Sequence, residues 1–256
     1  MSAGRPPADA TGSPRVRRRF FAAPEALDRE RVVFAPREAH HIARVLRLRP
    51  GTRIVVFDGA RDVEAELDTV DPDVVARRIG TPVVSRRPIE IALLQGVARG
   101  PRMDLVMRMA TEIGISAIYP VLTSRAVVEP GPGRLERWRR IALESAKQCG
   151  RPDLPDVRPP MSLTDALASL DPVDLLLVPW EEETRPLGAV IAGRPFAAAA
   201  VLIGPEGGLS LGEVDLVRRA GGETVSLGPL ILRTETAGLV AAAMLLYERL
   251  LRPPQH

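Results

Sequence analysis

The sequence is poor in the residues that build disulfide frameworks and metal sites. Its 256 residues include one cysteine, Cys149, and three histidines. A single cysteine excludes an internal disulfide framework and is typical of a reducing cytoplasm, which is the location we expect. His40, His41 and His256 have no metal-ligand spacing with Cys149, so we expect no metal site.

Long apolar runs are missing too. Those at residues 196–203 and 239–246 hold eight residues each, whereas a membrane-spanning helix needs about 20, so no span is expected. Residues 1–16 contain Arg, Pro and Gly without an apolar segment, which predicts a disordered tail rather than a secretory signal. With 45% hydrophobic residues, the rest of the chain can bury a normal core in one or two domains.

Lysine is almost absent, and each sign of charge is depleted in one part of the chain. Lys147 is the only lysine among 35 basic residues. Residues 95–152 carry ten basic and five acidic side chains, whereas residues 160–220 carry four basic and nine acidic ones. This asymmetry favours one face that binds a polyanion. Arginine suits such a face because its guanidinium binds phosphate in a bidentate manner.

The pattern along the chain predicts two folded domains. Residues 17–86 hold short β-rich segments, among them 53–57 and 63–70 around an Asp58-Gly59 turn, and one helix at 36–48. We expect a small β-barrel there, followed by a linker at 85–88. Residues 88–252 alternate between apolar strands and helices. The expected strands are 89–94, 118–122, 175–178, 197–203 and 224–227, and the expected helices include 104–113, 135–148 and 235–251.

This alternation predicts an α/β domain with a mostly parallel sheet covered on both faces. Two motifs follow strands of that sheet, A-V-L-I-G-P-E-G-G-L-S at 200–210 and V-S-L-G-P-L-I-L-R-T-E-T-A-G at 225–238. Their glycines let backbone approach a ligand, and such ligands sit at the carboxyl ends of strands. The apolar residues 230–232 follow a Gly-Pro turn, so we expect them tucked inside. Together the loops could enclose a flat, partly apolar ligand such as an adenosine.

Simpler roles exist for the polar residues of these motifs. The chain has neither G-x-G-x-x-G nor G-x-x-x-x-G-K-[ST], which disfavours a pyrophosphate site and a nicotinamide dehydrogenase. Glu206 could satisfy N–H groups and the dipole at a helix start near Ser210. Thr234, Glu235 and Thr236 could cap the last helix, and for the two threonines capping is the favoured interpretation.

The paired motifs G-P-E-G-G-L-S and L-G-P-L-I-L-R-T-E-T-A resemble the SPOUT superfamily of S-adenosyl-L-methionine (AdoMet)-dependent RNA methyltransferases. The most similar branch is the bacterial 16S ribosomal RNA uracil-N3 methyltransferase family. Residues 96–115, 120–125 and 144–155 are similar to it as well, as are R-R-F-F and H-H-I-A-R-V-L-R-L-R-P-G near the N-terminus. The resemblance covers about residues 17–250. Arg99, Arg108 and Leu209 depart from the family pattern but keep its charge or hydrophobicity.

The resemblance implies a PUA-like RNA-binding barrel, an α/β domain with a deep trefoil knot, and a homodimer. The last helix is Ala/Leu-rich nearly all round, which favours burial inside the domain or against a second subunit. The resemblance also implies an AdoMet pocket in the knot loops. The implied cofactor-binding residues are Pro179, Trp180, Glu181, Ile203, Gly204, Pro205, Glu206, Gly207, Leu227, Gly228, Leu230, Ile231, Leu232 and Arg233.

Methylation of uracil N3 requires an exposed Watson–Crick edge, a proton acceptor and a group that stabilises charge on two carbonyl oxygens. Arg233 is the first candidate for charge stabilisation, and Glu235 is a candidate acceptor. The residues expected to position RNA are Arg17, Arg18, Arg19, Arg44, Arg47, Arg99, Arg102, Arg125, Lys147 and Arg151. Two alternatives stay open. One is a ribose 2′-O methyltransferase of the same superfamily, which the L-R-T-E-T segment disfavours, and the other is a non-catalytic RNA-binding or ribosome-assembly factor.

Overall fold

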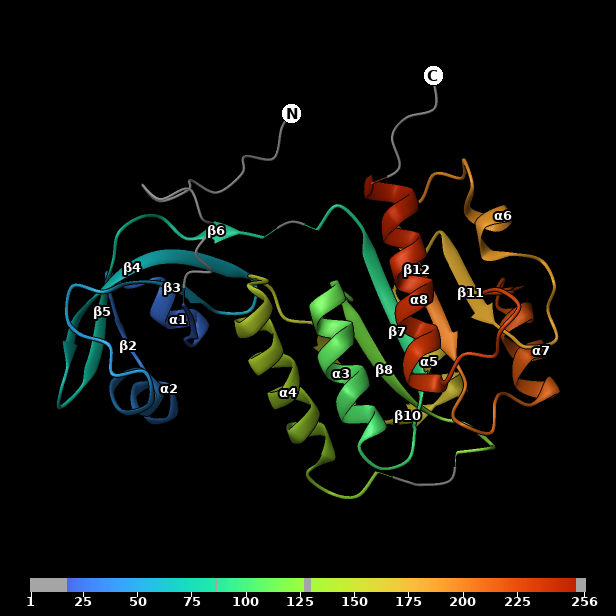
Figure 1. The fold of residues 1–256 in the computed structure, drawn as a ribbon, viewed down its shortest axis with the longest axis horizontal. Coiled ribbons are helices and arrows are strands. Elements are labelled where there is room, and N and C mark those ends of the chain that lie inside the picture. Colours follow the sequence, from blue (N-terminus) through green and yellow to red (C-terminus); the bar gives the residue numbers. More distant parts are fainter. Residues whose placement is uncertain (1–17, 86, 127–129, 252–256) are drawn as a thin grey trace. The chain divides into compact units, whose positions relative to one another are not determined.

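The structure is a computed structural model that describes residues 18–85, 87–126 and 130–251 (Figure 1). Its contacts divide the chain into two compact units. The first unit comprises Met1–Ser85 with Ala146–Asp153, and the second comprises Arg86–Ser145 with Leu154–His256. The first boundary falls in the linker predicted at residues 85–88. The assignment of residues 146–153 to the first unit has no counterpart in the sequence-based division.

The first unit is built on one mixed sheet with the strand order β1-β3-β4-β5-β2, in which β6 also pairs with β4. Strand β1 lies parallel to β3, and the remaining pairs are antiparallel. Alternate side chains of β4 and β5 enter a core that also holds Phe20, Val32 and Ile42. The strands are β1 (Arg19–Phe21), β2 (Arg31–Val33), β3 (Arg53–Phe57), β4 (Arg61–Val70), β5 (Val74–Arg78) and β6 (Val83–Val84).

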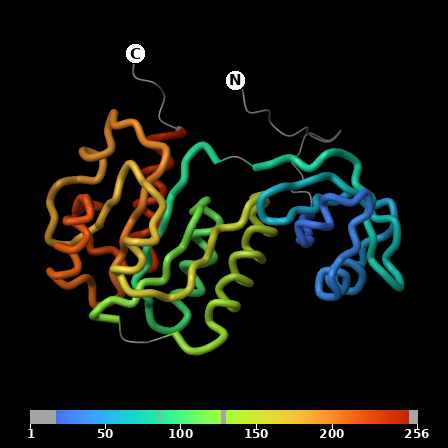
Figure 2. Tube along the Cα trace, turned by 180° about the vertical axis from the view of Figure 1, so that it is seen from behind, coloured from blue at the N-terminus to red at the C-terminus, as the bar shows by residue number. Residues whose placement is uncertain are grey.

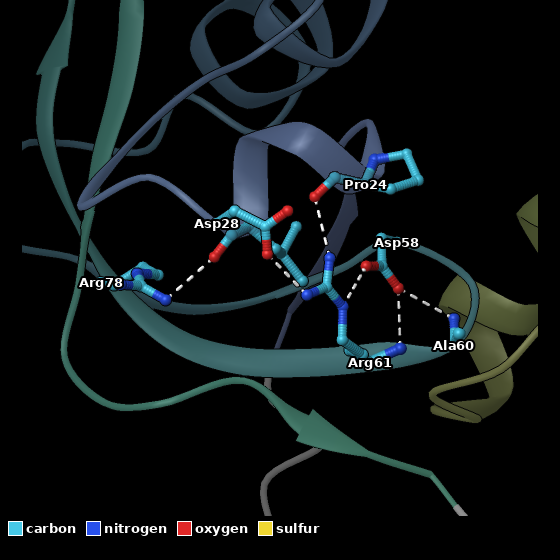
Figure 3. A network of polar contacts seen from close by, with 7 residues as sticks. Pro24, Asp28, Asp58, Ala60, Arg61 and Arg78 are labelled. Carbon is cyan, nitrogen blue, oxygen red and sulfur yellow. Dashed lines mark hydrogen bonds and ion pairs between the residues drawn. The ribbon is translucent and has the colours of Figure 1, made fainter.

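An arginine network fixes the turn between β3 and β4 (Figure 3). Arg61 donates from Nε to Asp58 Oδ2 (2.8 Å) and from Nη1 to Asp28 Oδ1 (2.7 Å). Its Nη2 donates to the Pro24 carbonyl oxygen (2.9 Å). Burial raises the pKa of Asp58, but hydrogen bonds from the backbone N–H groups of Ala60 and Arg61 outweigh burial and leave the pKa lowered. The turn predicted here therefore rests on an ionised carboxylate.

The predicted helix at 36–48 is shorter and less regular than expected. Besides the short helix α1 (Pro24–Leu27), the first unit contains α2 (Pro36–His40), which continues as a π-helical turn, η1 (His41–Val45). Arg47 then adopts a left-handed conformation with φ 50°, which is uncommon for a residue with a side chain. Periodicity predicted the buried face, with Ile42 fully buried, but it could not indicate the wider turn.

The second unit contains a sheet whose strand pairs are all parallel, in the order β10-β8-β7-β12-β11-β13, with β9 beside β8. Ile91 and Leu93 of β7 belong to one core cluster, and Ala92 and Leu94 belong to another. The sheet is therefore buried on both faces, as predicted. Its strands are β7 (Glu90–Gly96), β8 (Ala117–Leu122), β9 (Asp156–Val157), β10 (Met161–Ser162), β11 (Leu175–Pro179), β12 (Ala198–Ile203) and β13 (Glu223–Val225).

Helices cover the two faces of this sheet unequally. The larger core lies under α3 (Arg102–Ile113), α4 (Arg134–Cys149), α6 (Leu187–Ile191) and α8 (Thr234–Leu246). The smaller core lies under α5 (Leu163–Ala168) and α7 (Leu211–Arg219), and a π-helical turn, η2 (Tyr247–Leu251), extends α8. The orange and red segments, which carry the two C-terminal motifs, lie together in both views (Figures 1 and 2). Within the described ranges, no helix is long and apolar enough to cross a membrane.

Candidate active site

The carboxyl ends of three neighbouring parallel strands bring the predicted loops together. Strand β12 runs into the turn 204–209, β11 into Trp180 and Glu181, and β13 into the segment 226–232. These segments enclose two adjoining cavities of about 480 and 500 Å³. The cavities share the walls Pro179, Trp180, Glu181, Ile231, Leu232 and Ala237. The site thus lies where a parallel sheet places its ligands.

The two cavities differ in chemistry. Arg102, Glu206, Arg233 and Glu235 line the first, which we call the charged cavity. The second, which we call the loop cavity, is lined largely by the segment 226–232. Of the residues assigned to the cofactor from sequence, Leu227, Gly228 and Leu230 line only the loop cavity. Ile203, Gly204, Pro205, Glu206, Gly207 and Arg233 line only the charged one, and Pro179, Trp180, Glu181, Ile231 and Leu232 line both.

Close packing within the protein leaves little room for a side chain at the glycines of the 204–208 turn. A Cβ on Gly204 would lie 2.8 Å from the carbonyl carbon of Gly208, and one on Gly207 would lie 3.2 Å from the Arg125 Cβ. A Cβ on Gly96, at the end of β7, would meet the nitrogen of Pro205 at 2.5 Å. Gly96 and Gly204 thus permit close backbone packing, and Gly204 and Gly207 also line the charged cavity, so their role in admitting a ligand stays a prediction. Gly228 has φ 126° and open space around it.

The apolar residues after the Gly-Pro turn are not tucked inside, which corrects the sequence-based expectation. Leu230 is 77% exposed and Ile231 is 87% exposed, although both line the loop cavity. An isolated apolar residue on a surface needs no explanation, but adjacent ones at a cavity mark a binding surface. The sequence could not reveal this exposure, because apolar residues after a Gly-Pro turn give the same pattern in a buried turn and in a cavity wall.

Glu206 joins the turn to the loop before α3. Its Oε1 accepts hydrogen bonds from the backbone N–H of Arg99 (2.9 Å) and from Arg102 Nη1 (3.0 Å). Glu206 thus satisfies a backbone N–H group, as the simpler interpretation held, but one from another segment. The cap of α7 is Ser210, which forms a reciprocal capping box with Glu213.

Thr234 has a bridging role rather than the capping role favoured from sequence. The N-cap of α8 is Arg233, whose side chain makes no capping hydrogen bond. The Thr234 hydroxyl donates to the Gly204 carbonyl oxygen (2.6 Å) and accepts from Gln95 Nε2 (2.9 Å). Gln95 and Thr234 are buried, so this chain ties β7, the turn after β12 and the start of α8 together. Gln95 escaped the sequence analysis because it lies 139 residues away from its partner.

The loop after β11 is held by a cation–π contact and by hydrogen bonds to a carboxylate. Arg218 stacks over the Trp180 ring, with its guanidinium carbon 5.3 Å from the centroid. Glu183 accepts hydrogen bonds from the backbone N–H groups of Arg185 and Thr184 and from the Thr224 hydroxyl, which lower its pKa. The ionised Glu183 therefore fixes the wall of the loop cavity.

The residues predicted to contact RNA divide into exposed and internally paired ones. Arg18, Arg44, Arg47, Arg99 and Arg125 are exposed, and Arg125 also donates to the Gly207 carbonyl oxygen (3.0 Å). Arg17 lies outside the described residues. The side chains of Arg19 and Arg151 are only 9% and 10% exposed and pair with Asp62 and Asp153, respectively.

Lys147 and Arg102 form ion pairs with carboxylates, and their assignment to phosphate binding stays a prediction. The Lys147 ammonium forms an ion pair with Glu38 (2.7 Å) inside the first unit, and the two side chains are 7% and 8% exposed. A phosphate could reach this ammonium only by breaking that pair. Arg102 lines the charged cavity and contacts Glu206 and Glu235. In the part of the chain that the structure describes, no group of His, Cys, Asp and Glu side chains could hold a metal ion.

Comparison with known proteins defines the class of protein to which this chain belongs. A family model described as an RNA methyltransferase domain matches residues 85–246, and a second, described as an RNA methyltransferase PUA domain, matches residues 34–68. The ribosomal RNA small subunit methyltransferase E of Bacillus subtilis is 32% identical over 233 residues, which cover 85% of this chain and 91% of that protein. The protein of the same name from Synechocystis is 32% identical, over 89% of this chain and 76% of that protein.

Solved structures agree with these matches. A ribosomal RNA small subunit methyltransferase E from Neisseria gonorrhoeae, bound to S-adenosyl methionine, is 30% identical, with a TM-score of 0.80 over 90% of this chain and 97% of that chain. A methyltransferase from Legionella pneumophila, also with that cofactor bound, has a TM-score of 0.79 at 28% identity, over 90% and 97% of the two chains. The chain is therefore an RNA methyltransferase. It belongs to the ribosomal RNA small subunit methyltransferase E family.

Proposed function

We propose that this protein methylates N3 of a uridine in the RNA of the small ribosomal subunit, with AdoMet as the methyl donor, during maturation of that subunit. The observation that carries the proposal is the pair of adjoining cavities at the carboxyl ends of β11, β12 and β13. One is a largely apolar loop cavity, and the other holds Arg233 and Glu235. The names of the relatives and the cofactor in the two solved structures support it.

The loop cavity fits the adenosine part of AdoMet. Leu230, Ile231 and Leu232 supply apolar walls, and the backbone at the open Gly228 can approach a flat ring closely. Glu181 lines both cavities and offers a carboxylate to the positive charge of the donor. When bound, AdoMet supplies an electrophilic methyl group. The role of the protein is to hold that group against the base in the neighbouring charged cavity.

The charged cavity supplies the two groups that the chemistry requires. Uracil N3 carries a proton, and its removal spreads negative charge over the two carbonyl oxygens of the ring. Glu235 accepts the proton, since its carboxylate lines the cavity, and Arg233 donates hydrogen bonds to the oxygens as the charge develops. Arg233 directly follows the segment 226–232 and lines the charged cavity.

The experiment that tests this function is nucleoside mass spectrometry of small-subunit ribosomal RNA. RNA from cells that lack the protein is incubated with the purified protein and AdoMet, digested and compared with untreated RNA. We expect N3-methyluridine at one position. A 2′-O-methylated nucleoside would assign the chain to the ribose-modifying alternative. Tight AdoMet binding without any methylation would contradict the proposal as a whole.

We also propose that the exposed arginines of both units hold the RNA by its phosphates. Arg18, Arg44 and Arg47 of the first unit and Arg99 and Arg125 of the second are available for such contacts. Phosphate binding predicts an affinity that falls steeply with salt. Arg-to-Glu changes in both clusters should weaken RNA binding at every sequence, as measured by filter binding over a salt series. Unchanged RNA affinity would contradict this assignment.

A homodimer is the third part of the proposal. Leu105 and Met109, one turn apart on α3, are 38% and 37% exposed, and Tyr247 and Leu250 of η2 are 56% and 44% exposed. These apolar side chains favour burial against a second copy of the chain. Light scattering of the purified protein should give twice the 27.7 kDa chain mass. A Met109→Glu variant should shift the protein toward a monomer.

A further inference from the structure

The charged cavity contains an arginine held between two carboxylates. Arg102, the first residue of α3, contacts Glu206 Oε1 through Nη1 (3.0 Å) and Glu235 Oε2 through Nε (3.7 Å). Glu206 comes from the turn after β12 and Glu235 from the first turn of α8. Three segments far apart in the sequence thus fix this guanidinium at the cavity wall, where 39% of it is exposed.

The two carboxylates differ in their remaining capacity to accept hydrogen bonds. Glu206 Oε1 already accepts from Arg102 and from the backbone N–H of Arg99. Glu235 lies at an ion-pair distance from Arg102, and its buried Oε2 has no hydrogen-bond partner among the described residues. A buried acceptor without a donor is costly. Because the Glu235 side chain is 13% exposed and lines the cavity, its carboxylate can accept a hydrogen bond from a ligand there.

Two arginines, Arg102 and Arg233, line the same cavity as Glu235. A guanidinium carries five N–H donors and no acceptor, and the ion pairs of Arg102 engage only a part of them. The wall thus offers the donors of two guanidinium groups and a carboxylate acceptor. The Watson–Crick edge of uracil presents an acceptor, a donor and an acceptor, at O4, N3–H and O2. Cytosine presents an amino donor and a bare N3 acceptor in place of the first two.

We propose that Arg102 is a specificity-determining residue that, with Glu235 and Arg233, reads the imide edge of the target uracil and rejects cytosine. This inference rests on the proposed function and adds the means by which the base is chosen. With cytosine in the cavity, the carboxylate of Glu235 faces the N3 lone pair, and a guanidinium faces the amino group. Both contacts are repulsive. A site built around polar partners rejects a ligand that leaves those partners unpaired.

The test uses short RNAs that carry the methylated uridine, or cytidine in its place, with the full-length protein. Wild-type protein should bind the uridine RNA about tenfold or more tightly than the cytidine RNA, the discrimination of one well-formed base contact. Arg102→Ala should bring the two affinities to within about threefold of each other by raising the Kd for the uridine RNA alone. Arg102→Lys keeps the charge without the planar fork and should lose most of the discrimination.

The matched control is Arg108→Ala, which removes an exposed arginine from the same helix outside the cavity and should leave the discrimination unchanged. Calorimetry with AdoMet should give a Kd for Arg102→Ala within a few-fold of that of the wild type. Equal weakening for both RNAs, with a shallower salt dependence, would instead make Arg102 a phosphate contact and overturn the inference. A parallel loss of AdoMet affinity would overturn it as well. Absence of N3-methyluridine with wild-type protein would reject the proposed function separately.

Discussion

Arg233 is the residue whose placement bears most directly on the chemistry. It is the N-cap of α8, is exposed, and makes no capping hydrogen bond, so its guanidinium serves no structural purpose that the helix start requires. A structural arginine would instead be paired, as Arg137 is with Asp104. An exposed cation at a cavity wall fits the stabilisation of charge that appears only during the reaction.

We therefore expect Arg233→Ala to lower the turnover of methyl transfer about 100-fold or more, the effect of removing a charge-stabilising donor. The affinity for AdoMet should change by no more than a few-fold, because the apolar walls of the loop cavity remain. Single-turnover kinetics with labelled AdoMet measures the first quantity and calorimetry the second. A variant that turns over at the wild-type rate would remove Arg233 from the mechanism.

Thr234 offers a second test at the scale of one residue. Its hydroxyl is shared by the Gly204 carbonyl oxygen and Gln95 Nε2 in a buried site. Thr234→Val keeps the shape but leaves both partners unsatisfied, which costs about 1–3 kcal/mol of the free energy of unfolding. Methyl transfer should also slow, since Gly204 lines the charged cavity that receives the base. Thr234→Ser keeps the hydroxyl and is the matched control, so urea unfolding should separate the two variants.

At the scale of elements, the carboxylate of Glu213 in helix α7 links the turn 204–209 to the loop after β8. Glu213 accepts from the backbone N–H and the hydroxyl of Ser210 and from the backbone N–H of Ser124. Burial raises the pKa of Glu213, but these hydrogen bonds outweigh burial and leave the pKa below its ordinary value of 4.5. The capping box thus depends on an ionised Glu213.

A carboxylate whose pKa is lowered by folding stabilises the folded state above its unfolded pKa, and this contribution is lost as pH falls through the folded pKa. Glu213→Gln should therefore be less stable than the wild type at neutral pH, and the difference should shrink below pH 4.5. Ser210→Ala should cost about 1 kcal/mol through loss of the cap. Thermal unfolding at a series of pH values measures both effects. A difference that is constant with pH would show that the charge of Glu213 contributes nothing.

Elements were predicted well where one periodic pattern decides them. Strand 53–57 has the predicted bounds, and helix α7 begins at the predicted place. The prediction of one regular helix at 36–48 was wrong, since the segment contains a π-helical turn. Periodicity reports only which residues are buried, and Ile42 stays buried in either form of helix. The loops were placed at one site correctly, since parallel strands share an edge. The exposure of Leu230 and Ile231 was missed, because apolar residues in a loop do not reveal whether they face a core or a cavity.

At the scale of the whole molecule, the chain returns to its first unit after leaving it. Residues 146–153, which include the end of α4, belong to the unit formed by residues 1–85. Lys147 pairs there with Glu38, 109 residues away, and such a pair leaves no periodic signal in a sequence. Basic residues around Lys147 favoured a phosphate contact. The structure places its ammonium in a buried ion pair with Glu38.

Two units with separate cores should unfold in two steps rather than one. Removing one partner of a buried ion pair leaves the other charge uncompensated, which costs about 3–5 kcal/mol. Lys147→Ala should therefore lower the midpoint of the transition that belongs to the first unit and leave the other midpoint in place. AdoMet at 100 times its Kd should increase the free energy of unfolding of the second unit by about 2.7 kcal/mol. It should therefore raise the midpoint of that unit's transition and leave the midpoint of the first unit unchanged.

Differential scanning calorimetry of the wild type and the Lys147→Ala variant, each with and without AdoMet, measures all four cases. The double variant Lys147→Met with Glu38→Leu is the control, because it removes both charges and should recover most of the loss. The two perturbations act on different cores, so their effects should add. A single transition that both perturbations shift would contradict the division into two independently folded units. It would mean that the Lys147–Glu38 pair and the AdoMet site stabilise the same cooperative unit.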